Sequence, residues 1–196
     1  MHMQKSFKKI IIIVFLAALG GGVGYYFTHH TSSEHSQEQG PIYDYNEARD
    51  KAEIKQVFVD EHWWLLMGDY DVDFMLDYKA PHQDPLYVGK LHVKVLREKN
   101  QFIGFACYYK KTVTEGALLF LAIKKEFRKR GYACKLAQYV VEDFAKMGVK
   151  KVTLVTRIQN IAGQATYTKL GFTEVNRNNV HVFYEKPTNQ PMTCPK

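Results

Sequence analysis

The stretch from residue 120 to residue 133 carries the residue types of a phosphate-binding loop. An apolar run leads into a basic segment with Arg128, Lys129 and Arg130, and Gly131 follows at the expected start of an amphipathic helix. Amides at a helix start lack intrahelical partners and carry the positive end of the dipole, so they stabilise an anion. Gly131 allows close backbone approach because it has no Cβ. The three cations suit a pyrophosphate or a 3′-phosphate.

A second pattern lies downstream, between Asn160 and Phe172. Asn160 stands just before a predicted helix, where its side chain can act as an N-cap. The segment contains Tyr167 and ends in Lys-Leu-Gly-Phe, in which Gly171 is placed to stop the helix.

Both segments resemble sequence motifs of the GNAT family of N-acetyltransferases. Residues 128–133 match R-x-x-G-x-A of motif A, which holds the pyrophosphate of acetyl-CoA in that family, and Ile123 fills its β-branched position five residues earlier. Residues 160–172 match N-x-x-A-x-x-x-Y-x-K-L-G-F of motif B, with Gly163 in place of the usual Ala. Residues 125–127 read Lys-Glu-Phe where the family often has Pro-Glu-Tyr, so the proline is lost. The resemblance covers about residues 42–185.

The resemblance implies an α/β fold with a central mixed, mostly antiparallel sheet flanked by helices. Two strands of that sheet splay apart, and the pantetheine arm of acetyl-CoA lies between them. Exposed backbone of the first splayed strand pairs with the arm and fixes the thioester beside an amine, which is catalysis by proximity. The cofactor-binding residues expected on this basis are Leu121, Ile123, Arg128, Lys129, Arg130, Gly131, Tyr132, Ala133, Asn160 and Tyr167.

The resemblance also assigns chemical roles. Tyr167 matches the motif-B tyrosine that often protonates the leaving thiolate, although it could simply pack against the cofactor arm. Asn160 matches a position that bonds the arm, or it caps the helix, or both. A backbone amide near Leu121–Ile123 is expected to stabilise the oxyanion.

The general base is left open by the sequence. Residues 116–123 before the loop contain no acid, so the candidates are Glu115, Glu61, His62, Asp73 and His181, or a chain of water molecules, unless the amine arrives unprotonated. In the family, the region around Asp69, Asp71 and Asp73 helps to form the acceptor site, so these carboxylates would attract a cationic amine; otherwise they form a solvated acidic loop.

Hydrophobic periodicity predicts the elements that must position these residues. Short hairpins indicate an antiparallel meander, and the strands flanking the crossover between 131 and 157 should be parallel. Strands are expected at 42–45, 91–96, 102–109, 116–123, 152–157, 172–175 and 180–185, and helices from Asn46 or Asp50 toward Leu66, from Gly131 to Gly148, and over 162–170.

Composition argues against a nucleic-acid binder. The chain has 196 residues, 46% of them apolar, and a net charge of +7. Lys5, Lys8 and Lys9 supply three of these charges, and the remaining excess is too mild for the dense basic stripe of a nucleic-acid protein. The excess suits a domain that binds a polyanionic cofactor.

Residues 10–27 form an uncharged run that follows three lysines and is long enough to cross a bilayer. We interpret it as a single-pass anchor, or as a signal peptide whose apolar core is 10–19 and after whose cleavage the protein is exported. The positive-inside rule places the folded domain on the far side of the membrane, where acetyl-CoA is scarce, so the orientation is open. The expected organisation is a basic segment 1–9, the apolar segment 10–27, a polar linker 28–40, an N-acetyltransferase domain 41–186 and a disordered tail 187–196.

The cysteines give no disulfide framework. Cys107, Cys134 and Cys194 are odd in number and lack metal-ligand spacing. We expect Cys107 and Cys134 to be reduced, packed thiols, which favours a reducing compartment, although Cys134 near a helix start could instead be reactive.

Three classes of function remain. The first is an N-acetyltransferase that moves an acetyl group from acetyl-CoA to a primary amine by direct attack in a ternary complex, without a metal. The second is a non-catalytic acyl-CoA-binding module tethered to a membrane, and the third is a nucleic-acid or lipid-surface binder using residues 124–130. The first implies an amine acceptor, either a small molecule or a protein, membrane contact through the N-terminal segment, and no nucleic acid. A homodimer is left open.

Overall fold

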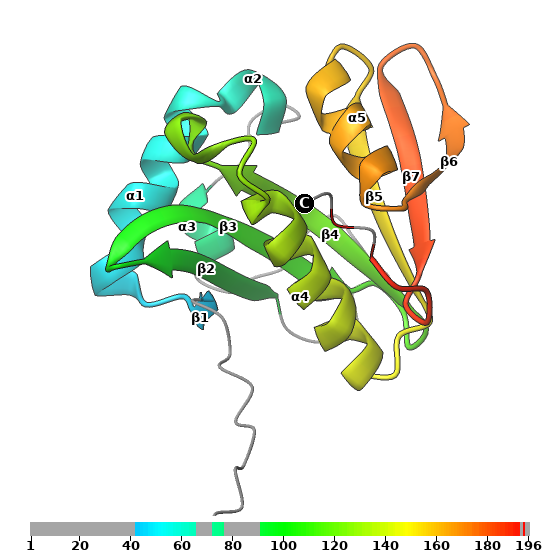
Figure 1. Ribbon diagram of the computed structural model, residues 1–196, viewed down its shortest axis with the longest axis horizontal. Coiled ribbons are helices and arrows are strands. Elements are labelled where there is room, and N and C mark those ends of the chain that lie inside the picture. Colours follow the sequence, from blue (N-terminus) through cyan, green and yellow to red (C-terminus); the bar gives the residue numbers. More distant parts are fainter. Residues whose placement is uncertain (1–41, 66–71, 77–90, 193, 195–196) are drawn as a thin grey trace, which may run out of the picture. The chain divides into compact units, whose positions relative to one another are not determined.

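The computed structural model in Figure 1 describes residues 42–65, 72–76, 91–192 and 194. The apolar segment 10–27, the linker 28–40, and Asp69 and Asp71 lie outside the described residues. None of the helices within the described residues combines the length and the apolar character that a bilayer crossing requires.

A seven-stranded mixed sheet forms the centre of the domain, in the order β1-β2-β3-β4-β5-β7-β6. Among the strand pairs of the described residues, only β4–β5 is parallel, as expected for two strands joined through a crossover helix. The strands are β1 (Ile42–Asp44), β2 (His92–Glu98), β3 (Gln101–Lys110), β4 (Glu115–Ile123), β5 (Lys151–Arg157), β6 (Thr173–Arg177) and β7 (His181–Pro187). The helices are α1 (Glu47–Asp60), α2 (His62–Leu65), α3 (Val72–Leu76), the 3₁₀ turn η1 (Lys125–Phe127), α4 (Tyr132–Lys146) and α5 (Ile161–Lys169).

Side-chain alternation along the central strands builds one apolar core on each face of the sheet. The first core lies on the α4 side and contains Ile103, Tyr108, Val140, Phe144 and Leu154, among others. The second core lies on the α1 and α3 side and contains Ile54, Phe58, Met75, Phe105 and Phe120, among others. In Figure 1, α4 crosses one face of the sheet.

Helix α4 confirms the periodicity expected of it. Apolar side chains at three- and four-residue spacing, including Leu136, Val140 and Phe144, are buried. Gly131 begins the helix with φ of 82° and Gly148 follows it with φ of 79°. Both positions are left-handed, which only glycine adopts without strain.

Strand β4 contains an irregularity that the sequence did not predict. Phe120 pairs with Cys107 and Leu118 pairs with Tyr108, so Leu119 bulges out of the ladder with β3. Leu119 and Phe120 consequently both face the second core, whereas Leu118 and Leu121 both face the first.

The expected splay between β4 and β5 is present. The two strands pair only from Glu115↔Lys151 to Ala117↔Thr153. Beyond that point, residues 118–123 of β4 and 154–157 of β5 have no partner strand across the gap.

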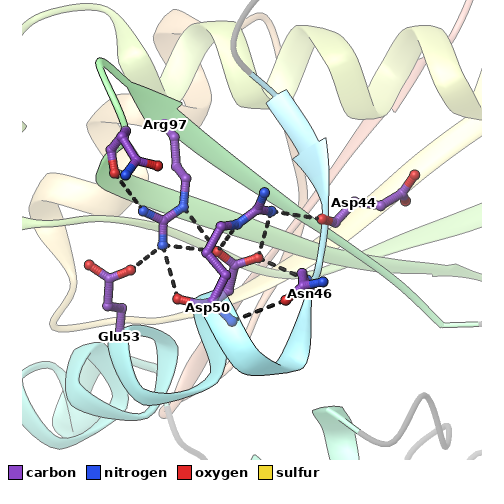
Figure 2. Close-up of polar contacts among 7 residues, drawn as sticks. Asp44, Asn46, Asp50, Glu53 and Arg97 are labelled. Atoms are coloured by element: carbon purple, nitrogen blue, oxygen red, sulfur yellow. Dashed lines mark hydrogen bonds and ion pairs between the residues drawn. The ribbon is translucent and has the colours of Figure 1, made fainter.

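Helix α1 is tied to β2 by a buried charged network, shown in Figure 2. Asp50 is fully buried, and its Oδ1 accepts hydrogen bonds from Arg97 Nε and Arg49 Nε at 2.9 and 2.8 Å. The second carboxylate oxygen accepts from the Asn46 amide, and Arg97 also contacts Glu53. Burial by itself would raise the pKa of Asp50, but the hydrogen bonds from Arg49, Asn46 and Arg97 outweigh it and lower that pKa. The expected single helix toward Leu66 is wrong, because it ends at Asp60 and α2 begins separately at His62.

The cysteine prediction is half right. Cys107 is a free, buried thiol, as expected. The prediction that Cys134 is a reduced thiol is wrong, because it forms a disulfide with Cys194 across a sequence separation of 60 residues. The tail beyond β7, predicted to be disordered, instead makes specific contacts, which begin with the Thr188 amide donating to Lys150 O at 2.9 Å.

Candidate active site

The loop before α4 is shaped for an anion. Lys129 has φ of 61° and Gly131 has φ of 82°, so two left-handed residues turn the chain just before the helix. A Cβ built on Gly131 would meet nothing within 4 Å, which shows open space beside this backbone. The first intrahelical bond runs from Lys135 N to Gly131 O at 3.1 Å, leaving the amides of residues 132–134 without a helical acceptor. These are the groups that a phosphate would bind.

The three cations of the loop divide into two kinds. Lys129 and Arg130 are exposed, with the Arg130 guanidinium 5.6 Å from the Phe127 ring centre. Arg128 turns back instead: its Nε donates to Ile123 O at 2.9 Å, and its Nη2 lies 2.6 Å from Glu61 Oε1. The guanidinium of Arg128 therefore joins the loop to the end of β4 and to the α1–α2 corner.

The neighbouring loop residues contribute shape and packing. The Tyr132 hydroxyl donates to Glu98, and its ring meets Phe127 edge to face. Tyr132 and Ala133 pack against the first core, as does Leu121 of β4, while Ile123 belongs to that core. These residues border the open end of the β4–β5 gap.

Asn160 is the N-cap of α5. Its Oδ1 accepts from the Gly163 amide at 2.9 Å, and its Nδ2 donates to Thr156 Oγ1 at 3.1 Å. A Cβ at residue 163 would lie 2.4 Å from Asn160 Nδ2. The glycine that replaces the usual alanine of this motif therefore leaves room for the capping side chain.

Tyr167 lies among aromatic rings. Its ring centre is 5.9 Å from that of Tyr184 and 6.2 Å from that of Phe172. The residue keeps partial exposure, yet burial among these groups, with a smaller effect of Tyr184, raises the pKa of its hydroxyl to about 12. The hydroxyl is therefore protonated at neutral pH and can donate a hydrogen bond. Among the described residues, none accepts one from it.

The structure separates the candidates for the general base. Glu115 pairs in register with Lys151 at the closed end of the gap, about 20 Å along β4 from Leu121 at about 3.3 Å per residue. Asp73 pairs with Lys55 at 2.7 Å, and Glu61 pairs with Arg128. His181 lies opposite Arg157 at the open end of the gap. The side chain of His62 lies outside the described residues.

One contact at the open end was not anticipated from the sequence. The Arg157 guanidinium of β5 lies 5.0 Å from the ring centre of Trp63 in α2. Trp63 is 55% exposed, and its neighbour Trp64 is also exposed. Two adjacent tryptophans in the sequence are the signal that could have pointed to this surface. Within the described residues, no group of three His, Cys, Asp or Glu side chains is placed to bind a metal ion.

The fold and the loop together define the class of an acyltransferase domain built around a splayed sheet. Residues 57–172 match the acetyltransferase (GNAT) family, so the chain belongs to this family and carries its acetyl-CoA-dependent acyltransferase domain.

Similar proteins extend this picture. The chain is 31% identical over 87 residues to N-alpha-acetyltransferase 30 of Schizosaccharomyces pombe, a match that covers 42% of this chain and 58% of that relative. The fold resembles Ard1 from Thermoplasma volcanium, with a TM-score of 0.59 and 17% identity over 74% of this chain and 95% of that one. It also resembles the PaiA N-acetyltransferase from Thermoplasma acidophilum in complex with coenzyme A, with a TM-score of 0.58 and 18% identity over 74% and 97% of the two chains.

Proposed function

We propose that this protein transfers the acetyl group of acetyl-CoA to a primary amine by direct attack in a ternary complex. The observation that carries the proposal is the position of the Gly131 loop beside a gap whose β4 edge, residues 118–123, lacks a partner strand. The amides at the start of α4 would hold the diphosphate, with Lys129 and Arg130 adding charge. The amide-rich pantetheine arm would then pair with β4 near Leu121 and Ile123.

The chemical step needs no group other than the two substrates and the protein. The amine nitrogen attacks the thioester carbonyl carbon, the C–S bond breaks, and the amine loses one proton to a base or to water. The leaving thiolate takes up one proton. We assign Tyr167 as the hydrogen-bond donor to that sulfur and a backbone amide of β4 near Leu121 or Ile123 as the donor to the oxyanion.

Arg128 has a positioning role in this proposal. Because its guanidinium bonds Ile123 O and Glu61, it fixes the end of β4 relative to the loop. Protonation of Glu61 would weaken that ion pair, which argues against Glu61 as the base. His181, at the open end of the gap, is the candidate that we retain.

The name of the yeast relative makes a protein or peptide N-terminus the first acceptor to test. The exposed Trp63 and Trp64 offer apolar surface at the open end, where a peptide side chain could pack. Small amines form the second panel. Anchoring through residues 10–27 stays a separate proposal, which protease accessibility of the domain in intact cells tests.

A matched pair of glycine variants tests the cofactor site. Gly131 and Gly148 lie at opposite ends of α4, both have φ near 80°, and neither has an atom within 4 Å of a built Cβ. Gly131→Asp and Gly148→Asp therefore suffer the same kind of backbone strain, but only Gly131→Asp places a carboxylate at the proposed diphosphate site. Calorimetry on full-length protein purified under reducing conditions should show at least a tenfold loss of acetyl-CoA affinity for Gly131→Asp alone.

Release of free CoA in the presence of peptide and small-amine panels distinguishes the enzyme from a binding module. An affinity for acetyl-CoA without any amine-dependent turnover would favour the non-catalytic module. Equal affinity in the two glycine variants would remove the loop assignment.

A further inference from the structure

The residues after β7 form a strap that runs back toward α4. The strap consists of residues 188–192 and Cys194, and in Figure 1 it leaves β7 and returns toward the region between α4 and α5. Thr188 fixes its start, because its amide donates to Lys150 O at 2.9 Å and its Oγ1 donates to Val149 O at 2.7 Å. Lys186 Nζ donates to Pro191 O at 3.1 Å. Cys194 fixes the far end through its disulfide with Cys134.

The two ends of the strap lie at the two ends of the β4–β5 gap. Lys186 pairs in register with Val152, which pairs with Gly116 where the gap is closed. Cys134 is in the first turn of α4, three positions after Gly131, where the gap is open. The strap therefore follows the gap along the α4 face of the sheet.

Contacts along the strap place it on the α4 side of the sheet. The Met192 side chain packs against the first core, the same core against which Leu121, Ala133 and Tyr167 pack. Cys194 Sγ lies 3.8 Å from Gln138 Oε1, one helical turn beyond Cys134. A pantetheine arm that entered from the Gly131 loop would have to cross the same surface.

Lys186 shows that the strap is packed closely. The Lys186 side chain is only 1% exposed, and burial lowers its pKa. A buried ammonium requires hydrogen-bond acceptors, and the carbonyl of Pro191 supplies one. The strap thus supplies an acceptor to a buried charge at the closed end of the gap.

We infer that the strap is a redox-controlled gate: the Cys134–Cys194 disulfide holds it across the cofactor gap, and reduction releases it to admit acetyl-CoA. The inference rests on the proposed function. For a ligand that binds only the open state, the apparent dissociation constant equals the intrinsic one divided by the fraction of molecules in the open state. The disulfide lowers the open fraction because its covalent bond keeps the end of the strap attached to α4.

The thiol chemistry of the gate is directional. Cys194 is exposed and Cys134 is buried, so a thiolate of a cellular dithiol reaches the Sγ of Cys194. The S–S bond breaks, and Cys134 leaves as a thiolate at the start of α4, where the helix dipole stabilises negative charge. The second thiol of the dithiol then displaces Cys194. Two electrons and two protons pass to the protein, and the reductant becomes a disulfide.

The test compares acetyl-CoA affinity of the full-length protein in its oxidised form and after reduction with dithiothreitol and removal of the reagent. Acetyl-CoA is the probe because its sulfur is acylated and cannot exchange with the disulfide. Thiol titration of denatured samples verifies the two states, since the chain has three cysteines. Reduction should tighten binding at least tenfold.

Two variants complete the test. Cys194→Ser and a chain that ends at Asn189, which keeps the Thr188 bonds, should bind like the reduced protein whether or not reductant is added. Equal affinity in all forms would uphold the proposed function and overturn the gate, as would tighter binding by the oxidised form. Absence of binding in every form would overturn both proposals.

Discussion

At the junction of α1 and β2 the buried charged groups find partners within the chain, whereas β4 and β5 stop pairing after Ala117↔Thr153. Asp50 and Arg97 are almost completely buried, and each bonds several neighbours. Within the sheet, residues 118–123 of β4 continue past the last paired residues of β5 and border the gap between the two strands.

This difference separates a scaffold from a binding surface. A buried polar group without a partner costs about 1–3 kcal/mol, so the closed network stabilises one arrangement of α1 on β2. The edge of β4 beyond Ala117 is instead open to β-type pairing with a ligand. Arg128 connects the two regions, because it bonds Glu61 at the end of α1 and Ile123 at the end of β4.

The largest expected effect comes from breaking the scaffold at Asp50. Asp50→Asn leaves the Arg97 guanidinium buried with less charge compensation, and loss of one partner of a buried pair costs about 3–5 kcal/mol. Urea unfolding should therefore show a large drop in the free energy of unfolding. Asp73→Asn is the control, since Asp73 forms exposed pairs with Lys51 and Lys55 and should leave the unfolding midpoint close to that of the unsubstituted protein.

The same carboxylate gives a pH dependence with a definite sign. The pKa of Asp50 is lowered in the folded state, so its contribution is complete above its ordinary pKa and is lost as pH falls through the lowered value. The difference in stability between the protein and Asp50→Asn should shrink on acidification over that range. A difference that grew with acidification would contradict the network.

A smaller effect is expected from Tyr167→Phe, on the open side. Loss of a proton-donating hydroxyl should lower kcat by about 100-fold or more while the affinity for acetyl-CoA changes little. Because the pKa of Tyr167 is raised to about 12, its ionisation should not limit the rate below about pH 10. Tyr184→Phe, a change in the adjacent ring, is the control and should keep its turnover. Equal rates for both variants would leave Tyr167 a packing residue.

The smallest effect is expected from Gly163→Ala. The new methyl displaces the Asn160 side chain, and loss of an N-cap costs about 1 kcal/mol, but alanine stabilises a helix by about 0.5–1 kcal/mol relative to glycine. The two terms nearly cancel, so stability should change little, whereas Asn160→Ala should lose about 1 kcal/mol without compensation. Acetyl-CoA titration of both variants then reports whether Asn160 also bonds the cofactor arm.

Local patterns were sufficient to predict much of the fold. The spacing of apolar residues predicts the apolar stripe of α4, and two glycines mark its ends. The same kind of pattern predicts the meander of β2, β3 and β4 and the parallel crossover to β5. These features depend on neighbours within a few residues.

Features that depend on distant contacts were missed. The Cys134–Cys194 disulfide, the Arg128–Glu61 pair and the Arg157–Trp63 contact each join segments that are far apart in sequence or separated by a turn. The bulge at Leu119 is equally hidden, because an all-apolar strand has no polar alternation from which a change of register could be read.

The bulge at Leu119 also limits how this strand can change during evolution. It interrupts the alternation of side chains midway along β4. As a result, Ala117 and Phe120 share a face although they are an odd number of residues apart. Deletion of Leu119 would remove the bulge and restore strict alternation while leaving the remaining side chains of β4 on their present faces. Deletion of Leu121 would instead move Phe120 to the face of the first core, so the position of a deletion decides whether the strand keeps its two faces.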